Sequence, residues 1–265
     1  MKTKIMMTIA GSDSSAGAGI QADMKSAFAA GVYCTTVITS LTAQNTCGVR
    51  AIETASADMV ASQMDAVLDD MDVTAVKCGM LPSEDIVRVV SVAASQGRLP
   101  QLVVDPVMVA TSGDRLIDDA AAQAVITELL PHTMLVTPNI PEVYAITGIR
   151  LDSSEGFDLA AGAFRALGCK AVLIKAGHLS GALLVDRLYD FVTGDVCDFS
   201  FPRIETPNTH GTGCSLSSAI TARLSAGAAL RDAVAGAEEF IHRAIDSGRH
   251  MEWGGGHGPI NHFIR

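Results

Sequence analysis

Several features are scarce or missing in this sequence, and each excludes a class of protein. No apolar run reaches the length of a membrane span, because the longest ones are the size of a β-strand. The 19 Lys and Arg residues are outnumbered by 29 Asp and Glu, and the formal net charge of −10 argues against a nucleic-acid or anionic-membrane partner. The six cysteines form no C-x-x-C pair and no metal-ligand spacing, so we expect a reduced, cytoplasmic protein.

Two common catalytic motifs are missing as well. The chain has no G-x-S-x-G sequence, which argues against a Ser-His-Asp hydrolase with a nucleophile elbow. It also has no G-x-x-x-x-G-K-[ST] sequence, so it has no P-loop. If the protein binds a nucleoside triphosphate, we expect it to do so with a different arrangement of residues.

The sequence has an abundance of apolar segments. Of its 265 residues 48% are hydrophobic and 18% charged, which is ample for a large core. Strand-like segments are expected at 5–10, 32–41, 50–54, 75–77, 102–105, 134–137 and 172–175. Helices are expected at 20–30, 59–71, 83–96 with Ser83 as N-cap, 119–130, 155–167, 214–226 and 230–246. Residues 183–201 read as antiparallel strands, which could form an edge that pairs with a second copy.

This alternation predicts an α/β fold. Strands that alternate with helices form right-handed βαβ units, with a mostly parallel sheet covered by helices on both faces. Continuous apolar strands fit burial on both faces. Because no linker, repeat or low-complexity stretch divides the chain, we expect a single domain over residues 1–265.

The stretch Asn208-Thr-His-Gly-Thr-Gly-Cys214 opens one of the expected helices. A Gly-rich turn at a helix start points several N–H groups and the helix dipole at one spot, which suits phosphate. Cys214 lies at this helix N-terminus, where the pKa of a thiol tends to fall. The alternative is an ordinary helix start, with Thr212 as the cap and Cys214 as a small core residue.

Polar residues directly follow several of the expected strands, where ligands bind in open α/β sheets. Asp105 ends a buried strand, which is costly unless the carboxylate is used. Asn139 and Glu142 start a helix and offer oxygen ligands to Mg²⁺, although they also fit a capping box. Lys175 could neutralise phosphate, or be a surface lysine with a buried stem.

Residues 17–22 fit the G-x-G-x-x-A form of a dinucleotide fingerprint, but their context does not. The first glycine lies seven residues past the strand, and no Asp or Glu occurs between Asp23 and Glu53. The loop could instead wrap a small substrate, with Asp23 either as a polar anchor or merely favouring its helix start. His257 and His262 are interpreted as packing residues of the C-terminal segment.

Gln44 follows the second expected strand. Its amide can donate and accept hydrogen bonds, which suits a heteroaromatic ring with an amino group and ring nitrogens. A surface turn is the alternative for this segment.

In combination, these motifs resemble the bacterial hydroxymethylpyrimidine/phosphomethylpyrimidine kinases of thiamine biosynthesis. The resemblance is carried by segments spread in order over the chain, at residues 10–23, 41–46, 105–108, 137–142, 208–214 and 256–263. That family belongs to the ribokinase-like superfamily, which implies a three-layer α/β/α fold. It further implies two successive ATP-dependent steps, which phosphorylate 4-amino-5-hydroxymethyl-2-methylpyrimidine and then its monophosphate. A homodimer is implied too.

The resemblance also assigns roles to residues. Gln44 would read the pyrimidine, helped by Gly11, Asp23, Met80 and Val107. The nucleotide and its Mg²⁺ would be served by Asp105, Asn139, Glu142, Lys175, Thr209 and His210, with Asp105 and Glu142 nearest the metal, directly or through water. Gly211, Thr212 and Gly213 would form the anion hole, and Cys214 occupies the position where most ribokinase-like enzymes carry an Asp base.

One residue departs from the family pattern. Many family members have Lys where Thr111 lies, in a loop that we expect to act as a flap, so any contact from such a Lys to ATP is missing here.

Alternative functions are also considered. Pyridoxal kinase, on the same scaffold, is the closest rival, although a subgroup of it has a second Cys in the flap and this chain has none. A thiol-dependent redox protein and a non-catalytic pyrimidine-binding protein are rivals of other classes.

Overall fold

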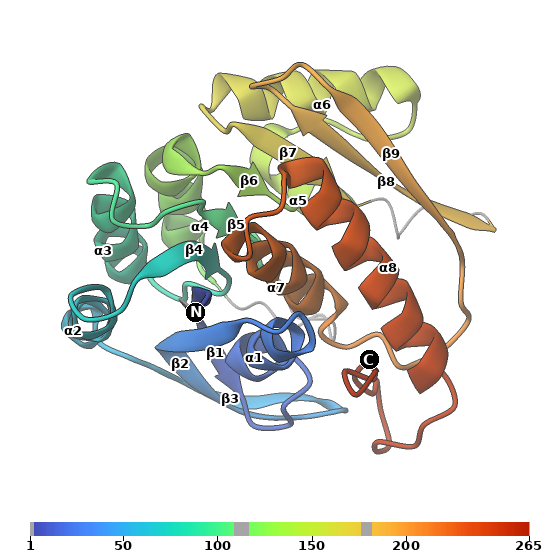
Figure 1. Ribbon diagram of the computed structural model, residues 1–265, viewed down its shortest axis with the longest axis horizontal. Helices are drawn as coiled ribbons and strands as arrows, with labels where there is room; N and C mark the ends of the chain where they lie inside the picture. The colour runs from blue at the N-terminus through green and yellow to red at the C-terminus, as the bar shows by residue number, and fades with distance from the viewer. Residues whose placement is uncertain (1–2, 109–116, 176–181, 265) are drawn as a thin grey trace.

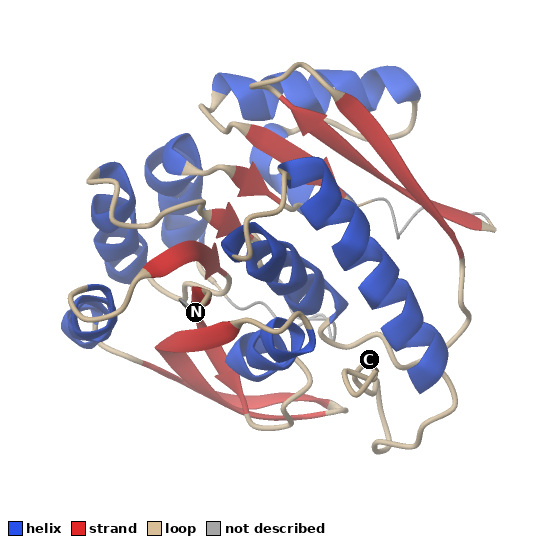
Figure 2. Cartoon of the chain, in the orientation of Figure 1, coloured by secondary structure: helices blue, strands red, loops and turns tan. Residues whose placement is uncertain are grey.

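The computed structural model describes residues 3–108, 117–175 and 182–264. In this part of the chain nine strands form one sheet in the order β3-β2-β1-β4-β5-β6-β7-β8-β9 (Figure 2). Six neighbouring strands are parallel: β1 (Ile5–Asp13), β2 (Tyr33–Asn45), β4 (Val73–Cys78), β5 (Val103–Val104), β6 (Leu135–Val136) and β7 (Ala171–Ile174). Antiparallel strands flank them, with β3 (Gly48–Thr54) at one end and β8 (Leu183–Asp190) and β9 (Val196–Pro202) at the other.

Neighbouring side chains along the central strands pack alternately into two different apolar clusters. Val76, Val104 and Val136 belong to one apolar cluster, whereas Ala75, Val103 and Leu135 belong to another. This follows from the period of two in a strand, because neighbouring side chains point to opposite faces of the sheet. The sheet therefore needs a helical layer on each face.

Two groups of helices supply these layers (Figure 1). On one face lie α1 (Gly19–Ala29), α7 (Thr212–Ser225) and α8 (Leu230–Gly248). The other face is covered by α2 (Ala57–Leu68), α3 (Glu84–Ser95), α4 (Asp119–Ala124), α5 (Ile140–Thr147) and α6 (Ser154–Ala166). The expected three-layer α/β/α fold with a mostly parallel sheet is confirmed.

Several elements differ in extent from the expectation. β1 continues to Asp13 and β2 to Asn45, since after a shift in register at Ala10 to Ser12 the two strands go on pairing through Leu41 and Thr42. Residues 41–45 are therefore strand, and the surface-turn alternative is wrong for them. The helix expected at 119–130 changes after Ala124 into a π-helical turn (Val125–Leu129) and then a 3-10 turn that contains Pro131, which cannot donate a backbone hydrogen bond.

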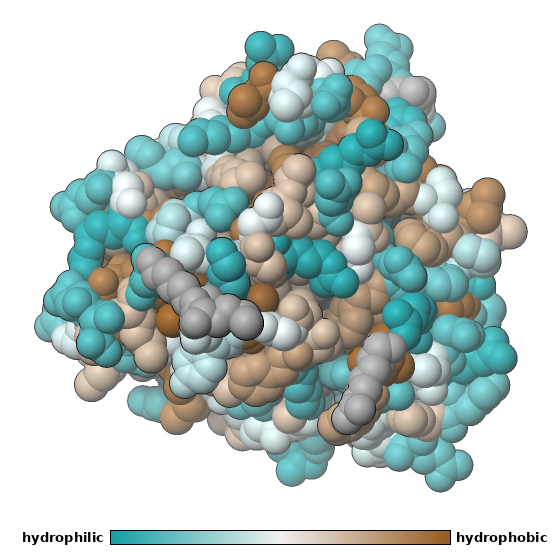
Figure 3. All heavy atoms as spheres, viewed as in Figure 1, coloured by the Kyte–Doolittle hydropathy of each residue, from teal (hydrophilic) through white to brown (hydrophobic). Residues whose placement is uncertain are grey.

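In the described part of the chain, no helix is long and apolar enough to cross a membrane. Figure 3 shows hydrophilic residues interspersed with hydrophobic ones on the face that carries α7 and α8.

Candidate functional site

A cavity of about 760 Å³ lies at the carboxyl ends of the parallel strands. Its lining takes one or more polar residues from the end of nearly every strand: Asp13, Gln44, Lys77, Asp105, Asn139 and Lys175. The N-terminus of α7 lines the cavity between the two ends of this row. β1 lies between β2 and β4, so the strand order reverses there, which is where open α/β sheets bind their ligands.

On the side of the cavity next to β1, which we call the β1 side, His210 joins two other residues. Its Nε2 atom lies 2.9 Å from Oδ2 of Asp13 and 3.3 Å from the side-chain amide of Gln44. The Thr42 hydroxyl lies 3.2 Å from Oε1 of Gln44, and so holds the amide from the other direction. The amide therefore lies between His210 and Thr42 while it faces the cavity. The expectation placed His210 with the nucleotide residues, but the structure places it beside Gln44.

Asp13 anchors this arrangement. Its carboxylate accepts hydrogen bonds from the Ser15 hydroxyl and from the N–H groups of Ser15, Gly17 and Ala18. Burial works to raise its pKa, but the hydrogen bonds from His210, Ser15 and Ala18 outweigh burial and lower the pKa to about 2. The carboxylate is therefore ionised at neutral pH. No role was predicted for Asp13 from the sequence, although it lies within the segment 10–23 that carries the family resemblance.

Gly11, Met80 and Val107 complete this region. All three line the cavity, as expected. The Sδ atom of Met80 lies 3.9 Å from the Ser40 hydroxyl. The cavity that Gln44 faces is thus also lined by small and apolar residues, an environment that fits a flat ring.

The start of α7 has the backbone geometry expected of an anion site. Gly211 is the N-cap with φ of +79°, and a Cβ atom on it would lie 1.8 Å from the carbonyl oxygen of Gly17, so only glycine fits. Thr212 is the first helical residue, so the alternative of Thr212 as the cap is wrong. Within the described residues the N–H groups of Gly213 and Cys214 have no hydrogen-bond acceptor. They can therefore bind a ligand oxygen.

Cys214 differs from the expectation in its acidity. Burial raises the pKa of its thiol to about 11, and Asp23 and Asp105 raise it too, whereas Lys77 and the N–H of Gly19 act to lower it. The fall in pKa expected at a helix N-terminus is not found, because loss of solvation raises the pKa more than Lys77 and the N–H of Gly19 lower it.

The opposite side of the cavity, next to β7, carries the charges. On this β7 side the Lys175 ammonium donates to Oδ1 of Asp105 at 2.9 Å, and the Thr137 hydroxyl donates to the same oxygen at 3.2 Å. The Lys175 side chain is 13% exposed, so the surface-lysine alternative is wrong. Burial works to lower the pKa of Lys175, but Asp105 and Glu142 outweigh it and raise the pKa.

Asn139 and Glu142 form the capping box that was the alternative to a ligand role. The N–H of Glu142 donates to Oδ1 of Asn139, and the N–H of Asn139 donates to Oε2 of Glu142. Burial raises the pKa of Glu142 to about 7, against the opposing effect of Lys175. The box leaves Oε1 of Glu142 without a hydrogen bond among the described residues, so capping and ligand binding are compatible.

The residues present fit a Mg²⁺ ion. Oδ2 of Asp105 and Oε1 of Glu142 each lack a donor in the described structure, and both residues line the cavity. No group of three or more His, Cys, Asp or Glu residues suited to a metal occurs among the described residues. A pair of carboxylates matches the coordination that Mg²⁺ prefers in proteins, where one or two carboxylates bind the ion and water and phosphate supply its other ligands.

Asp23 lies elsewhere than expected. It is fully buried, is not part of the cavity lining, and forms an ion pair with Lys77 at 2.9 Å. The role of Asp23 as an anchor that touches the substrate is not supported by this position. The alternative is also wrong, because no acidic residue lies in the first turn of α1.

Besides Asp13, three lining residues were not predicted from the sequence. Lys77 is a buried charged residue one position before the end of β4, and the reasoning applied to Asp105 could have found it. Asp186 on β8 and Glu238 on α8 hydrogen-bond to each other across two elements far apart in the sequence, so no local signal pointed to them. Burial and Asp186 raise the pKa of Glu238 well above its usual value.

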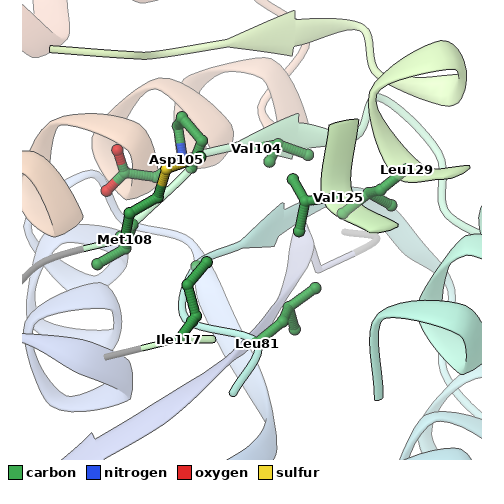
Figure 4. Close-up of a pocket in the computed structure, with 10 residues that line it drawn as sticks. Leu81, Val104, Asp105, Met108, Ile117, Val125 and Leu129 are labelled. Atoms are coloured by element: carbon green, nitrogen blue, oxygen red, sulfur yellow. The ribbon is translucent and has the colours of Figure 1, made fainter. Parts of the chain in front are cut away.

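A second, small pocket of about 10 Å³ lies behind Asp105 (Figure 4). The side chains of Leu81, Ile117, Val125 and Leu129 gather around it, while the Asp105 carboxylate points away from them (Figure 4). This apolar backing helps to hold the loop after β5.

The remaining expectations concern the chain's flap and its C-terminus. Thr111 lies outside the described residues. Thr209 lines the cavity next to His210. His262 is buried and lies 2.8 Å from the Ser215 hydroxyl, which agrees with a packing role, whereas His257 is exposed.

Comparisons with known proteins agree over nearly the whole chain. The profile of the family described as phosphomethylpyrimidine kinase matches residues 13–261. A hydroxymethylpyrimidine/phosphomethylpyrimidine kinase of Rhizobium meliloti (strain 1021) is 47% identical over 266 residues, which cover 99% of this chain and 98% of that protein.

Solved structures show the same likeness. Phosphomethylpyrimidine kinase from Clostridium difficile 630 has a TM-score of 0.81 at 39% identity and covers 91% of this chain and 99% of its own. Pyridoxal kinase from Staphylococcus aureus, in complex with AMP-PCP and pyridoxal, has a TM-score of 0.88 at 30% identity. The match covers 99% of this chain and 94% of the pyridoxal kinase. The ribokinase-like fold implied by the motifs is thereby confirmed.

Proposed function

The chain belongs to the phosphomethylpyrimidine kinase family and is therefore a phosphotransferase, and on that premise we propose the substrates and the residue roles. The hydroxymethyl oxygen of 4-amino-5-hydroxymethyl-2-methylpyrimidine attacks the γ-phosphorus of ATP, its O–H bond breaks, and ADP leaves with the bridging oxygen. In a second turnover a phosphate oxygen of the product attacks another ATP, which gives the diphosphate. These products serve thiamine biosynthesis.

One observation carries this proposal. The N–H groups of Gly213 and Cys214 have no acceptor in the described structure and lie between a ring-sized polar site at Gln44 and the charged group at Lys175. An acceptor held at one side and a nucleotide at the other would meet at the start of α7. Phosphoryl transfer depends mainly on such positioning and on electrostatic stabilisation.

The two sides then divide the substrates between them. Gln44, fixed by His210 and Thr42, hydrogen-bonds to the amino group and ring nitrogens of the pyrimidine. Lys175 and Asn139 bind phosphate oxygens of the nucleotide, and Asp105 and Glu142 hold Mg²⁺ directly or through water. The ion, when bound, offsets negative charge on the phosphates. Support for ATP comes from the similar kinase solved with AMP-PCP, an analogue of ATP.

Cys214 takes the hydroxyl proton in the first step. Its thiol lies at the third helical position of α7, next to the free N–H groups. Because the thiol pKa is raised to about 11, the base is the minor thiolate form that exists near neutral pH. As this thiolate accepts the proton, an S–H bond replaces the substrate O–H bond, and the thiol then returns the proton to water. In the second step the attacking phosphate oxygen is already ionised near neutral pH and needs little help from a base.

The test is an assay of ADP release with hydroxymethylpyrimidine, its monophosphate and pyridoxal, each with wild type and Cys214→Ala. We expect turnover with both pyrimidines. General-base contributions are about 10²–10⁴-fold, so the variant should lose about that factor in kcat for the first phosphorylation and much less for the second. Equal losses in both steps, or a first step within a few-fold of wild type, would contradict the base role. Faster turnover of pyridoxal would assign the protein to the rival kinase activity of its structural neighbours.

We propose that the protein works as a cytoplasmic homodimer. All six cysteines are unpaired, which suits a reducing compartment. β9 lies at the end of the strand order and can extend the sheet into a second copy. Light scattering at micromolar concentration should give twice the mass of the chain, and a monomer mass would contradict the dimer.

A further inference from the structure

Lys77 is a fully buried charge on the central strand β4. Neither its side chain nor that of Asp23 is exposed to solvent, and the Lys77 ammonium donates to both carboxylate oxygens of Asp23, at 3.0 and 2.9 Å. The remaining capacity of Asp23 is also used, by the hydroxyls of Thr8 and Ser218 at 2.6 Å each. Four hydrogen bonds therefore hold the Asp23 carboxylate in place.

Stability does not explain such a pair. Replacement of a buried ion pair by apolar residues of similar volume is often neutral or stabilising, because the desolvation of two charges offsets their attraction. A pair in the centre of the sheet therefore calls for another role. Neither residue has one in the phosphoryl transfer described above.

The position of the pair relative to Cys214 suggests that role. Ser218 follows Cys214 by four residues on α7, so the two side chains lie on the same face of the helix, and Ser218 contacts Asp23 directly. Lys77 and Cys214 line the same cavity. Gly79 leaves room for the ammonium there, since a Cβ atom on Gly79 would lie 2.7 Å from Nζ of Lys77.

The electrostatics agree with this geometry. Lys77 acts to lower the pKa of Cys214, and Cys214 acts in turn to raise the pKa of Lys77, so the two groups interact. Asp23 from α1 and Asp105 after β5 oppose this effect on Cys214, and the N–H of Gly19 assists it. Lys175 lies near the neighbouring residue, with Nζ 3.4 Å from a Cβ atom built on Gly213.

We propose that Lys77 is a positioning residue for the first phosphorylation: its ammonium is the buried counter-ion of the Cys214 thiolate, and Asp23 holds it in place. This inference rests on the proposed function. The substrate proton leaves its oxygen and binds Cys214 Sγ, so the site has a thiolate before transfer and a thiol after it. A cation that interacts with the sulfur stabilises the thiolate, which is the form that acts as base. Asp23 thus affects the chemistry from outside the cavity.

The test measures the thiol itself and needs no kinase activity. Cys47 and Cys197, which are more accessible than the buried Cys34, Cys78 and Cys169, are first changed to Ser. In this background the alkylation of Cys214 by iodoacetamide is followed by peptide mass spectrometry between pH 7.5 and 9.5. Below the thiol pKa the rate follows the thiolate fraction, and a neighbouring charge changes that fraction about tenfold or more.

The two partners should have opposite effects. Lys77→Met is expected to slow alkylation about tenfold, and Asp23→Asn to accelerate it about tenfold. A purely structural role predicts that either variant loosens the same cluster and changes the rate in the same direction. Thr8→Val is the matched control, because it removes a hydrogen bond to Asp23 without a change of charge, and its rate should stay within about threefold.

Several outcomes would overturn the inference. Changes in the same direction for Lys77→Met and Asp23→Asn, or rates for both within threefold of the background protein, would remove the counter-ion role. If circular dichroism shows that Lys77→Met is unfolded, the comparison of Asp23→Asn with Thr8→Val decides alone. A protein that shows the opposite shifts but no turnover of either pyrimidine would keep the counter-ion role and refute the proposed function.

Discussion

The two sides of the cavity are built on different principles. On the β1 side, the Gln44 amide lies between His210 and Thr42, and Asp13 accepts hydrogen bonds from several donors, His210 among them. On the β7 side, the carboxyl groups of Asp105, Glu142, Asp186 and Glu238 lie near Lys175, and some of their oxygens have no donor in the described structure. The polar groups on the β1 side are hydrogen-bonded to other protein groups, whereas the β7 side has carboxylate oxygens without a donor among the described residues.

This difference matches what each side is proposed to bind. A neutral ring is recognised by polar groups that are already oriented, because a loose amide would lose affinity on ordering. A triphosphate with Mg²⁺ brings its own charges, so a surplus of carboxylates becomes favourable only when the cation is present. The β7 side should therefore depend on Lys175 more than the β1 side depends on any one hydrogen bond.

The largest expected effect is on the β7 side. Lys175→Met leaves Asp105 and Glu142 without the lysine charge and removes the group proposed to bind the phosphates. We expect kcat/KM for ATP to fall by about 10²–10³-fold, which is typical for loss of one preorganised electrostatic contact. Steady-state kinetics with varied ATP measure this.

The matched control is Lys170→Met, at the other end of β7, where the lysine is exposed. This variant should have the kinetics of wild type. A loss of less than threefold for Lys175→Met would show that the two sides do not differ in the proposed way.

A smaller and more selective effect is expected on the β1 side. Gln44→Ala should raise KM for the pyrimidine about tenfold and leave KM for ATP nearly unchanged, because one hydrogen-bonding group to the ring is lost. His210→Asn should act in the same direction but more weakly, since Gln44 remains and only its anchor is removed. Initial rates with each substrate varied in turn separate the two constants.

Asn45→Ala is a suitable control, because this neighbouring amide accepts from the N–H of Cys47 and is not part of the cavity lining. A comparable rise in both KM values for Gln44→Ala would argue that the two sides are not independent.

The smallest effect concerns stability. The pKa of Glu238 is raised by burial and by Asp186, so the folded state favours its protonated form, and stability is lost as pH rises above the usual range of a carboxyl group. Glu238→Gln is neutral at every pH and should raise Tm at pH 8 by about 3 °C, with a smaller difference at pH 5. Thermal melts at both values test this.

The neighbouring Glu239 is exposed, and Glu239→Gln should leave Tm unchanged. A lower Tm for Glu238→Gln at pH 8 would mean that the ionised carboxylate contributes to stability on the β7 side.

Much of the fold and part of the site could be predicted from local patterns. The alternation of apolar strands and helices was sufficient for the three-layer sheet, because each pattern has its own period. Residues that follow strands, such as Asp105, Asn139 and Lys175, meet at one edge for the same topological reason. The ends of β1 and β2 were missed, since a shift in register leaves no mark on hydrophobic periodicity.

By itself, then, the sequence determined the sheet, the row of polar residues at its carboxyl edge and the Gly-rich start of the helix at Cys214. Only the tertiary structure decided that burial raises the pKa of this thiol to about 11, that His210 joins Gln44, and that Asp23 pairs with Lys77 beneath the cavity. The reason is physical. Hydrophobic periods and turn residues act locally, whereas solvation and charge depend on neighbours that lie far apart in the chain.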